Sequence, residues 1–201
     1  MSDMIDYYEE VLLLRKKVEK YETLLTGVNE MTTFDFGNGL VPAHQHPNGG
    51  GWVADTATVS KSAYVGPNAV VYDNAEVYDN AEVYDNARVY GNALVSGYAE
   101  VYDNAWVSGH AVVSGYARVY DNVRVSGDAW VSGNARVTGY AKVYGNARVY
   151  DNTRVTGNAV VTGNAWVTVN AWVSGHAVVS GNARVSGNAR VTGNARVTGN
   201  E

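Results

Sequence analysis

A valine recurs at every sixth position from Val53 to Val197, and this unbroken period constrains the fold more than any other feature. Twenty-five consecutive hexads are in register. Each hexad usually has alanine two residues before its valine, and glycine or aspartate followed by asparagine after it, as in Ala183-Arg184-Val185-Ser186-Gly187-Asn188. A repeat of this kind indicates a solenoid, in which each unit stacks on its neighbours.

Each hexad predicts a short strand followed by a turn. The alanine and the valine alternate with two variable residues, so the small side chains share one face. The Gly-Asn pair is typical of turns because both residues tolerate positive φ. A single strand of this size cannot offset its own ordering entropy, so successive coils must share a core and a hydrogen-bond ladder. Three hexads per coil predict about eight triangular coils in a rod of roughly 40 Å, at about 4.8 Å per rung.

The hexads resemble those of the hexapeptide-repeat superfamily. The stretch Val191-Thr192-Gly193-Asn194-Ala195-Arg196 matches its pattern of an aliphatic residue, a small residue, two free positions and a second small residue. The resemblance implies an all-β fold, a left-handed parallel β-helix over residues 52–201 with asparagine at the left-handed corner. The Gly-Gly-Trp-Val entry at residues 50–53 resembles that of uncharacterised members from bacteria and their phages, which implies a phage or prophage origin.

Residues 1–30 carry a different period, which predicts an N-terminal α-helical coiled coil. Apolar residues alternate there in steps of three and four, at Met4, Tyr7, Val11, Leu14, Val18, Tyr21, Leu25 and Val28. In a parallel pair Glu10 would face Arg15, and Lys17 would face Glu22, both with opposite charge. One amphipathic helix folded back onto its own rod is the alternative. Relatives in the superfamily are typically trimeric, so the resemblance implies a homotrimer.

Residues 31–51 form a predicted linker that contains His44 and His46. Threefold symmetry would gather six imidazoles from three such pairs. In these two residues the stretch resembles the iron-binding motif of some trimeric phage fibres and spikes. An Fe or Zn site at His44 and His46 is therefore one expectation, and two ordinary linker histidines with no cofactor are the other.

Outward-facing residues 18 positions apart are expected to stack into columns along the rod. The position before each valine holds all five tryptophans. One column contains Trp130, Arg148, Trp166 and Arg184; a second contains Arg118, Arg136, Arg154, Trp172 and Arg190; a third contains Tyr84, Tyr102 and Tyr120. Alternating Trp and Arg suits cation–π stacking, which contributes about 0.5–1 kcal/mol per exposed pair. The columns either only stabilise the sheets or also bind a glycan, an anionic polymer or a protein.

Many hexapeptide-repeat proteins are acyltransferases, whose catalytic histidine usually lies on a loop that interrupts the coils. No loop interrupts the hexads here, and His110 and His176 replace the turn asparagine on two different corners. We therefore expect a structural or adhesive rod, a trimeric fibre-like component, without catalytic residues. An acyltransferase-like enzyme is one alternative, and a phage accessory factor that binds a host protein or a small molecule is another.

Charge and composition narrow the remaining classes. The net charge of −5 is not that of a general nucleic-acid binder, and the absence of cysteine excludes disulfides and thiolate metal sites. No apolar run approaches the length of about 20 residues that a membrane span needs, and no signal peptide is apparent, so we expect a cytoplasmic or virion-associated protein. Residues 53–104 have a net charge of −6, whereas residues 105–200 have +6.

Overall fold

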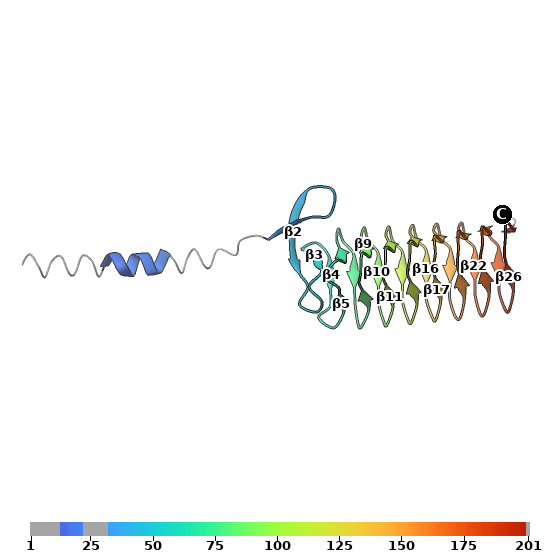
Figure 1. Ribbon diagram of the computed structural model, residues 1–201, viewed down its shortest axis with the longest axis horizontal. Coiled ribbons are helices and arrows are strands. Elements are labelled where there is room, and N and C mark those ends of the chain that lie inside the picture. Colours follow the sequence, from blue (N-terminus) through green and yellow to red (C-terminus); the bar gives the residue numbers. More distant parts are fainter. Residues whose placement is uncertain (1–12, 22–31, 200–201) are drawn as a thin grey trace, which may run out of the picture. The chain divides into compact units, whose positions relative to one another are not determined.

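The computed structural model describes residues 13–21 and 32–199. The chain divides into two compact units, Met1–Thr32 and Thr33–Glu201. In the first unit residues 13–21 form one helix, which carries Leu14, Val18 and Tyr21 of the predicted seam (Figure 1). Val11, Leu25 and Val28 lie outside the described residues. No helix within the described part of the chain is long and apolar enough to span a membrane.

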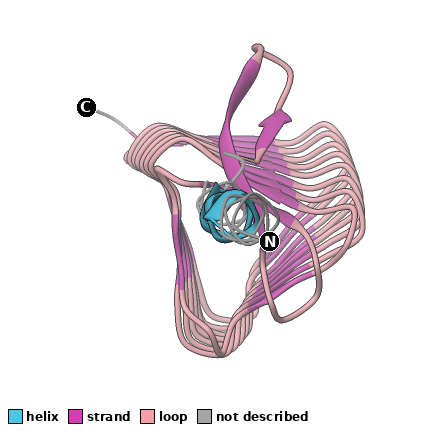
Figure 2. Cartoon of the chain, turned by 90° about the vertical axis from the view of Figure 1, so that its left-hand side faces the viewer, coloured by secondary structure: helices cyan, strands magenta, loops and turns pink. Residues whose placement is uncertain are grey.

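The second unit is a parallel β-solenoid of about eight coils, built from three sheets that surround one interior (Figure 2). The first sheet contains β1 (Thr33–Asp35), β2 (Leu40–Gln45), β3 (Trp52–Ala54), β6 (Val70–Val71), β9 (Arg88–Val89), β12 (Trp106–Val107), β15 (Arg124–Val125), β18 (Lys142–Val143), β21 (Val160–Val161), β24 (Val178–Gly181) and β27 (Arg196–Gly199). The second contains β4 (Thr58–Val59), β7 (Glu76–Val77), β10 (Leu94–Val95), β13 (Val112–Val113), β16 (Trp130–Val131), β19 (Arg148–Val149), β22 (Trp166–Val167) and β25 (Arg184–Val185). The third contains β5 (Tyr64–Val65), β8 (Glu82–Val83), β11 (Glu100–Val101), β14 (Arg118–Val119), β17 (Arg136–Val137), β20 (Arg154–Val155), β23 (Trp172–Val173) and β26 (Arg190–Val191).

The repeated valines and alanines form the core, as the period of six predicts. Every hexad valine from Val65 to Val179 is 0% exposed. Parallel pairing joins each strand to the strand 18 residues later, so that Val119 lies against Val101 and Val137. Each rung also donates backbone N–H groups to carbonyls of the next, as from Arg118 to Ala135 at 2.9 Å. The stacked coils therefore share one apolar interior and one continuous ladder.

The left-handed backbone conformation falls one residue earlier than the resemblance implies. From residue 73 to residue 193, positive φ occurs at the second residue after each core valine, for example at Gly157 (φ 69°) and Asp121 (φ 63°), and at no asparagine of residues 32–199. The expectation of a left-handed asparagine is therefore wrong. A Cβ atom added to Gly157 would lie 3.0 Å from the carbonyl oxygen of Gly175 in the next coil, so this position also requires a close backbone approach.

Aspartate replaces glycine at six of these turns, and each time its carboxylate bonds to the next coil. The Oδ2 atom of Asp121 accepts the N–H of Gly139 at 2.9 Å, and that of Asp73 accepts the N–H of Gly91 at 3.1 Å. Equivalent bonds come from Asp79, Asp85, Asp103 and Asp151. Aspartate tolerates the left-handed region better than most residues, and this bond offsets the strain of its Cβ atom.

A β-hairpin occupies most of the segment that the sequence predicts as a linker. Strands β1 and β2 pair antiparallel, and β2 continues antiparallel onto β3 of the first coil (Figure 1). Phe34 stacks on Trp52 with ring centroids 4.7 Å apart, and Phe36 stacks on Tyr72 at 5.0 Å. The hairpin is therefore packed against the solenoid by aromatic contacts, for which the period of six gives no signal.

Candidate functional site

Rows of tryptophan and arginine on the outside of the coils are the most regular polar surface of the solenoid. In the second sheet the register places Trp130, Arg148, Trp166 and Arg184 side by side, as predicted. In the third sheet it aligns Arg118, Arg136, Arg154, Trp172 and Arg190 in the predicted order. Their side chains point outward because each precedes a core valine on a two-residue strand.

Cation–π contacts hold the guanidinium groups on the indole rings. The Cζ atoms of Arg148 and Arg184 lie 5.3 and 4.6 Å from the ring centroid of Trp166, one from each neighbouring coil. Arg148 also lies 5.9 Å from Trp130, and Arg190 lies 5.2 Å from Trp172. Because both faces of Trp166 are covered by arginine, this ring is not free to stack on a ligand, and the outward contacts belong to the guanidinium groups.

A third row, around Trp106 on the first sheet, was missing from the sequence prediction. The Cζ atoms of Arg88 and Arg124 lie 5.5 and 4.7 Å from the centroid of Trp106. The step of 18 residues that found the other rows also links these three positions, so the sequence contained the signal. The register of each sheet thus places one tryptophan between two arginines, and these Arg–Trp–Arg units are Arg88–Trp106–Arg124, Arg148–Trp166–Arg184 and Arg154–Trp172–Arg190. In the last unit the cation–π contact comes from Arg190.

These three Arg–Trp–Arg units share the same surroundings. An asparagine lies two residues before each of their arginines and tryptophans, which gives a parallel row of three asparagines beside each unit. In one row Asn146 donates to Asn164, and Asn164 donates to Asn182, both at 3.1 Å. Small surface clefts of about 350 and 400 Å³ lie along the units at Trp106 and Trp172.

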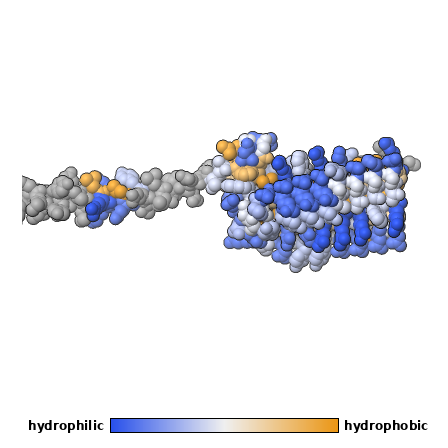
Figure 3. Space-filling view, viewed as in Figure 1, coloured by the Kyte–Doolittle hydropathy of each residue, from blue (hydrophilic) through white to orange (hydrophobic). Residues whose placement is uncertain are grey.

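None of the six arginines in these units forms an ion pair with a carboxylate of the described chain. Arg118, which lies outside these units, does form an ion pair: its Nη2 atom lies 2.9 Å from Oε1 of Glu100. The positive charge of residues 105–200 is therefore largely uncompensated at these rows. Figure 3 shows hydrophilic side chains over most of the visible face of the coils, whereas hydrophobic ones gather on the hairpin.

The predicted tyrosine column is also present, and its first two members lie on the acidic part of the rod. Tyr84, Tyr102 and Tyr120 stack with centroids 4.9 and 4.8 Å apart and with nearly parallel rings. Burial, reinforced by the charge of Glu100, raises the pKa of Tyr84 to about 12. Burial is also the main cause that raises the pKa of Tyr102. Half-buried phenols in contact with one another make this column a stabilising seam.

The two linker histidines lie in different environments. Nδ1 of His44 lies 2.8 Å from Oδ1 of Asp55, and both side chains are about half exposed. His46 is 3% exposed, and its Nδ1 atom lies 3.1 Å from the carbonyl oxygen of Asn48. Within residues 13–21 and 32–199, no group of three or more His, Cys, Asp or Glu residues is arranged to hold a metal ion. A site shared among three chains stays a prediction.

The two corner histidines behave as turn residues. The backbone N–H of His110 donates to the carbonyl of Gly127 at 2.8 Å, and that of His176 donates to Gly193 at 2.7 Å. These are the same bonds that the corner asparagines form. His110 follows β12 of the first sheet and His176 follows β23 of the third, so they lie on different corners, as the sequence predicts.

Comparison with known proteins found one matching family of repeats. The YdcK beta solenoid repeat matches residues 81–97, 87–101, 117–133, 129–145, 141–157 and 183–199. A search of curated proteins gave no match. The matched stretches lie entirely within the solenoid; they include Trp130 and Arg136 but not Trp166 or Trp172. The chain is thus similar to a β-solenoid repeat protein, in agreement with its observed fold.

Proposed function

We propose that this protein is a rigid binding rod whose arginine rows hold an acidic polysaccharide. The observation that carries the proposal is the set of three Arg–Trp–Arg units, one on each sheet, whose arginines have no carboxylate partner within residues 32–199. Guanidinium groups bind carboxylates through charge-assisted hydrogen bonds. Stacking on the indole restricts five of these six long side chains before a ligand arrives, which lowers the entropy cost of binding.

The regular spacing of the rows favours a polymer over a compact ligand. Arg148 and Arg184 lie two rungs apart, at roughly 4.8 Å per rung, on either side of Trp166. The same unit recurs on the other two sheets with the same neighbouring asparagines. A ligand with a repeating carboxylate, such as a polyuronate, can engage successive arginines along one face, whereas a single small anion contacts few of them.

Polyuronate binding by titration calorimetry tests the proposal. We expect the full chain to bind polygalacturonate but not neutral dextran, with an affinity that falls as salt rises, since these contacts are exposed. Each charge-assisted hydrogen bond contributes about 1.5–3 kcal/mol, so Arg148→Gln with Arg184→Gln should weaken binding at least about tenfold. Arg118→Gln is the matched control, because this arginine is already paired with Glu100. Equal losses in both variants, or a preference for double-stranded DNA, would contradict the proposal.

The rod acts as an oligomer in this proposal, with residues 1–30 as a parallel trimeric coiled coil. Leu14, Val18 and Tyr21 on the helix of residues 13–21 are each more than half exposed, which supports a role in association. Leu13 is equally exposed but lies outside the predicted seam. Analytical ultracentrifugation should find a trimer that Leu14→Asp dissociates and Leu13→Asp leaves intact. A monomeric wild type, or equal effects of both substitutions, would refute the trimer.

The finer features of the fold and the origin belong to the same proposal. The left hand and triangular section of the coil are supported by the hexad pattern, by three sheets and by a positive-φ residue at nearly every corner. The phage or prophage origin rests on the resemblance of residues 50–53 alone. The acyltransferase alternative predicts that acetyl-CoA raises the melting temperature, whereas a binding rod predicts no shift.

A further inference from the structure

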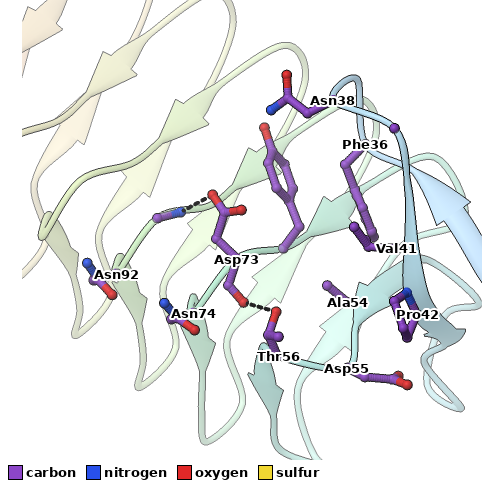
Figure 4. A pocket seen from close by; sticks show the side chains of 13 residues that line it. Phe36, Asn38, Val41, Pro42, Ala54, Asp55, Thr56, Asp73, Asn74 and Asn92 are labelled. Carbon is purple, nitrogen blue, oxygen red and sulfur yellow. Dashed lines mark hydrogen bonds between the residues drawn. The ribbon is translucent and has the colours of Figure 1, made fainter.

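A cavity of about 700 Å³ lies between the hairpin and the first coils (Figure 4). One wall comes from the hairpin, with Phe36, Val41 and Pro42. The opposite side consists of one corner of three successive coils, at residues 54–56, 72–74 and 91–92. The volume lies within the range typical of pockets for small molecules.

The hairpin loop over this cavity is fixed by its own hydrogen bonds. Oδ1 of Asp35 accepts the N–H of Gly37 at 2.7 Å and that of Gly39 at 2.9 Å. These bonds lower the pKa of Asp35, which keeps its carboxylate charged. Below the loop, Phe36 is 8% exposed and stacks on Tyr72. The apolar wall is therefore held in place without a ligand.

The cavity is lined by three asparagine side chains whose amides are free to bind a ligand. The side-chain amides of Asn38, Asn74 and Asn92 have no hydrogen-bond partner within residues 32–199. The two carboxylates differ from them, because Asp55 already lies against His44 and Asp73 already accepts the N–H of Gly91. An amide supplies both a donor and an acceptor, and the ligand group with the same dual character is a hydroxyl.

We infer that this cavity binds one neutral sugar residue, with its hydroxyls on the asparagine amides and its C–H face on the hairpin wall. For a cationic amine, one oxygen of each carboxylate is already engaged, Oδ1 of Asp55 by His44 and Oδ2 of Asp73 by the N–H of Gly91, whereas the three asparagine amides are wholly free within residues 32–199. A purely apolar ligand would leave the three amides unsatisfied. A sugar meets both requirements, since it carries hydroxyls around its rim and hydrocarbon on its face. The site shares no residue with the Arg–Trp–Arg units.

Saturation-transfer NMR and calorimetry with glucose, galactose, mannose and N-acetylglucosamine test this inference on the full chain. At least one sugar should bind saturably, and its contacts should map to Phe36 and Val41. Asn92→Ala removes up to two hydrogen bonds, so it should weaken binding about fivefold to tenfold. Asn158→Ala is the matched control, because Asn158 takes the same place in its hexad outside the cavity and is exposed.

The outcomes separate this site from the polymer rows. The Arg148→Gln, Arg184→Gln double variant should bind the sugar as the wild type does, even if polyuronate binding is lost or was never present. Lack of saturable binding by all four sugars would overturn the inference. Binding of spermidine in their place, or equal losses in the Asn92 and Asn158 variants, would also overturn it.

Discussion

Val169 is the one valine of the described chain with positive φ, and replacing it should stabilise the fold. It takes the turn position that glycine or aspartate fills elsewhere, with φ 67° and a side chain 43% exposed. The left-handed region costs an L-residue roughly 1–2 kcal/mol, and a β-branched side chain is among the least tolerant. Val169→Asp removes most of this strain and adds a carboxylate that can accept the N–H of Gly187, as Asp151 accepts that of Val169 at 3.1 Å.

The expected gain follows from these two contributions. Relief of most of the strain and one new hydrogen bond of about 0.5–1.5 kcal/mol should together raise the free energy of unfolding by about 1–3 kcal/mol for Val169→Asp. Val169→Gly should gain less, about 0.5–1 kcal/mol, because glycine loses more entropy on folding. Gly187→Ala is the reverse control: its φ is 67° and an added Cβ meets no atom within 4 Å, so only backbone strain is introduced.

Urea unfolding followed by circular dichroism measures all three variants. The reasoning requires both Val169 substitutions to raise the denaturation midpoint, with aspartate above glycine, and Gly187→Ala to lower it. If Val169→Asp and Val169→Gly are neutral or destabilising while Gly187→Ala has no effect, the turn residue is not left-handed and the corner geometry is refuted.

Two further predictions concern the core and the tyrosine column. Thr153 is 0% exposed and its Oγ1 atom has no hydrogen-bond partner, so Thr153→Val should raise the unfolding free energy by about 1–2 kcal/mol in the same assay. Val123, which is also 0% exposed, occupies the equivalent hexad position and shows that valine fits there. A loss of stability in Thr153→Val would contradict this reasoning. The pKa of Tyr84 is raised above its ordinary value, so the stability it contributes is complete below pH 10 and is lost as pH rises from 10 to about 12. Phenolate absorbance should therefore show late-titrating phenols, of which Tyr84→Phe removes one. A late step of unchanged size in this variant would disprove the burial of this phenol.

The core and the outer columns could be predicted because one number, the period, determines both. Six residues per hexad place Val119 inside, and three hexads per coil place Arg148 beside Trp166. The hairpin could not be predicted in this way, because it depends on contacts outside the repeat. Phe34 stacks on Trp52 and Phe36 stacks on Tyr72, which holds the hairpin in place. No periodic pattern in the sequence predicts these contacts. The sequence did not predict the cavity beside the hairpin for the same reason.

The sequence predicted the positions of the turns but not which turn residue adopts positive φ. Glycine and asparagine both tolerate positive φ, so the sequence alone did not decide which of them adopts it. The decision comes from the stacking of coils, since a Cβ on Gly175 would lie 2.9 Å from the backbone nitrogen of Gly193. The advantage of aspartate at Asp121 also depends on the next coil, whose N–H it accepts.

Amide hydrogen exchange, read residue by residue, tests the central claim most directly. The backbone N–H groups just before and just after each core valine donate to the next coil, as Arg118 does to Ala135 at 2.9 Å and Tyr120 to Val137 at 3.1 Å. Slow exchange should therefore recur with a period of six from residue 76 to residue 178. Fast exchange throughout, or protection with the 3.6-residue period of a helix, would contradict a stacked solenoid with its valines inside.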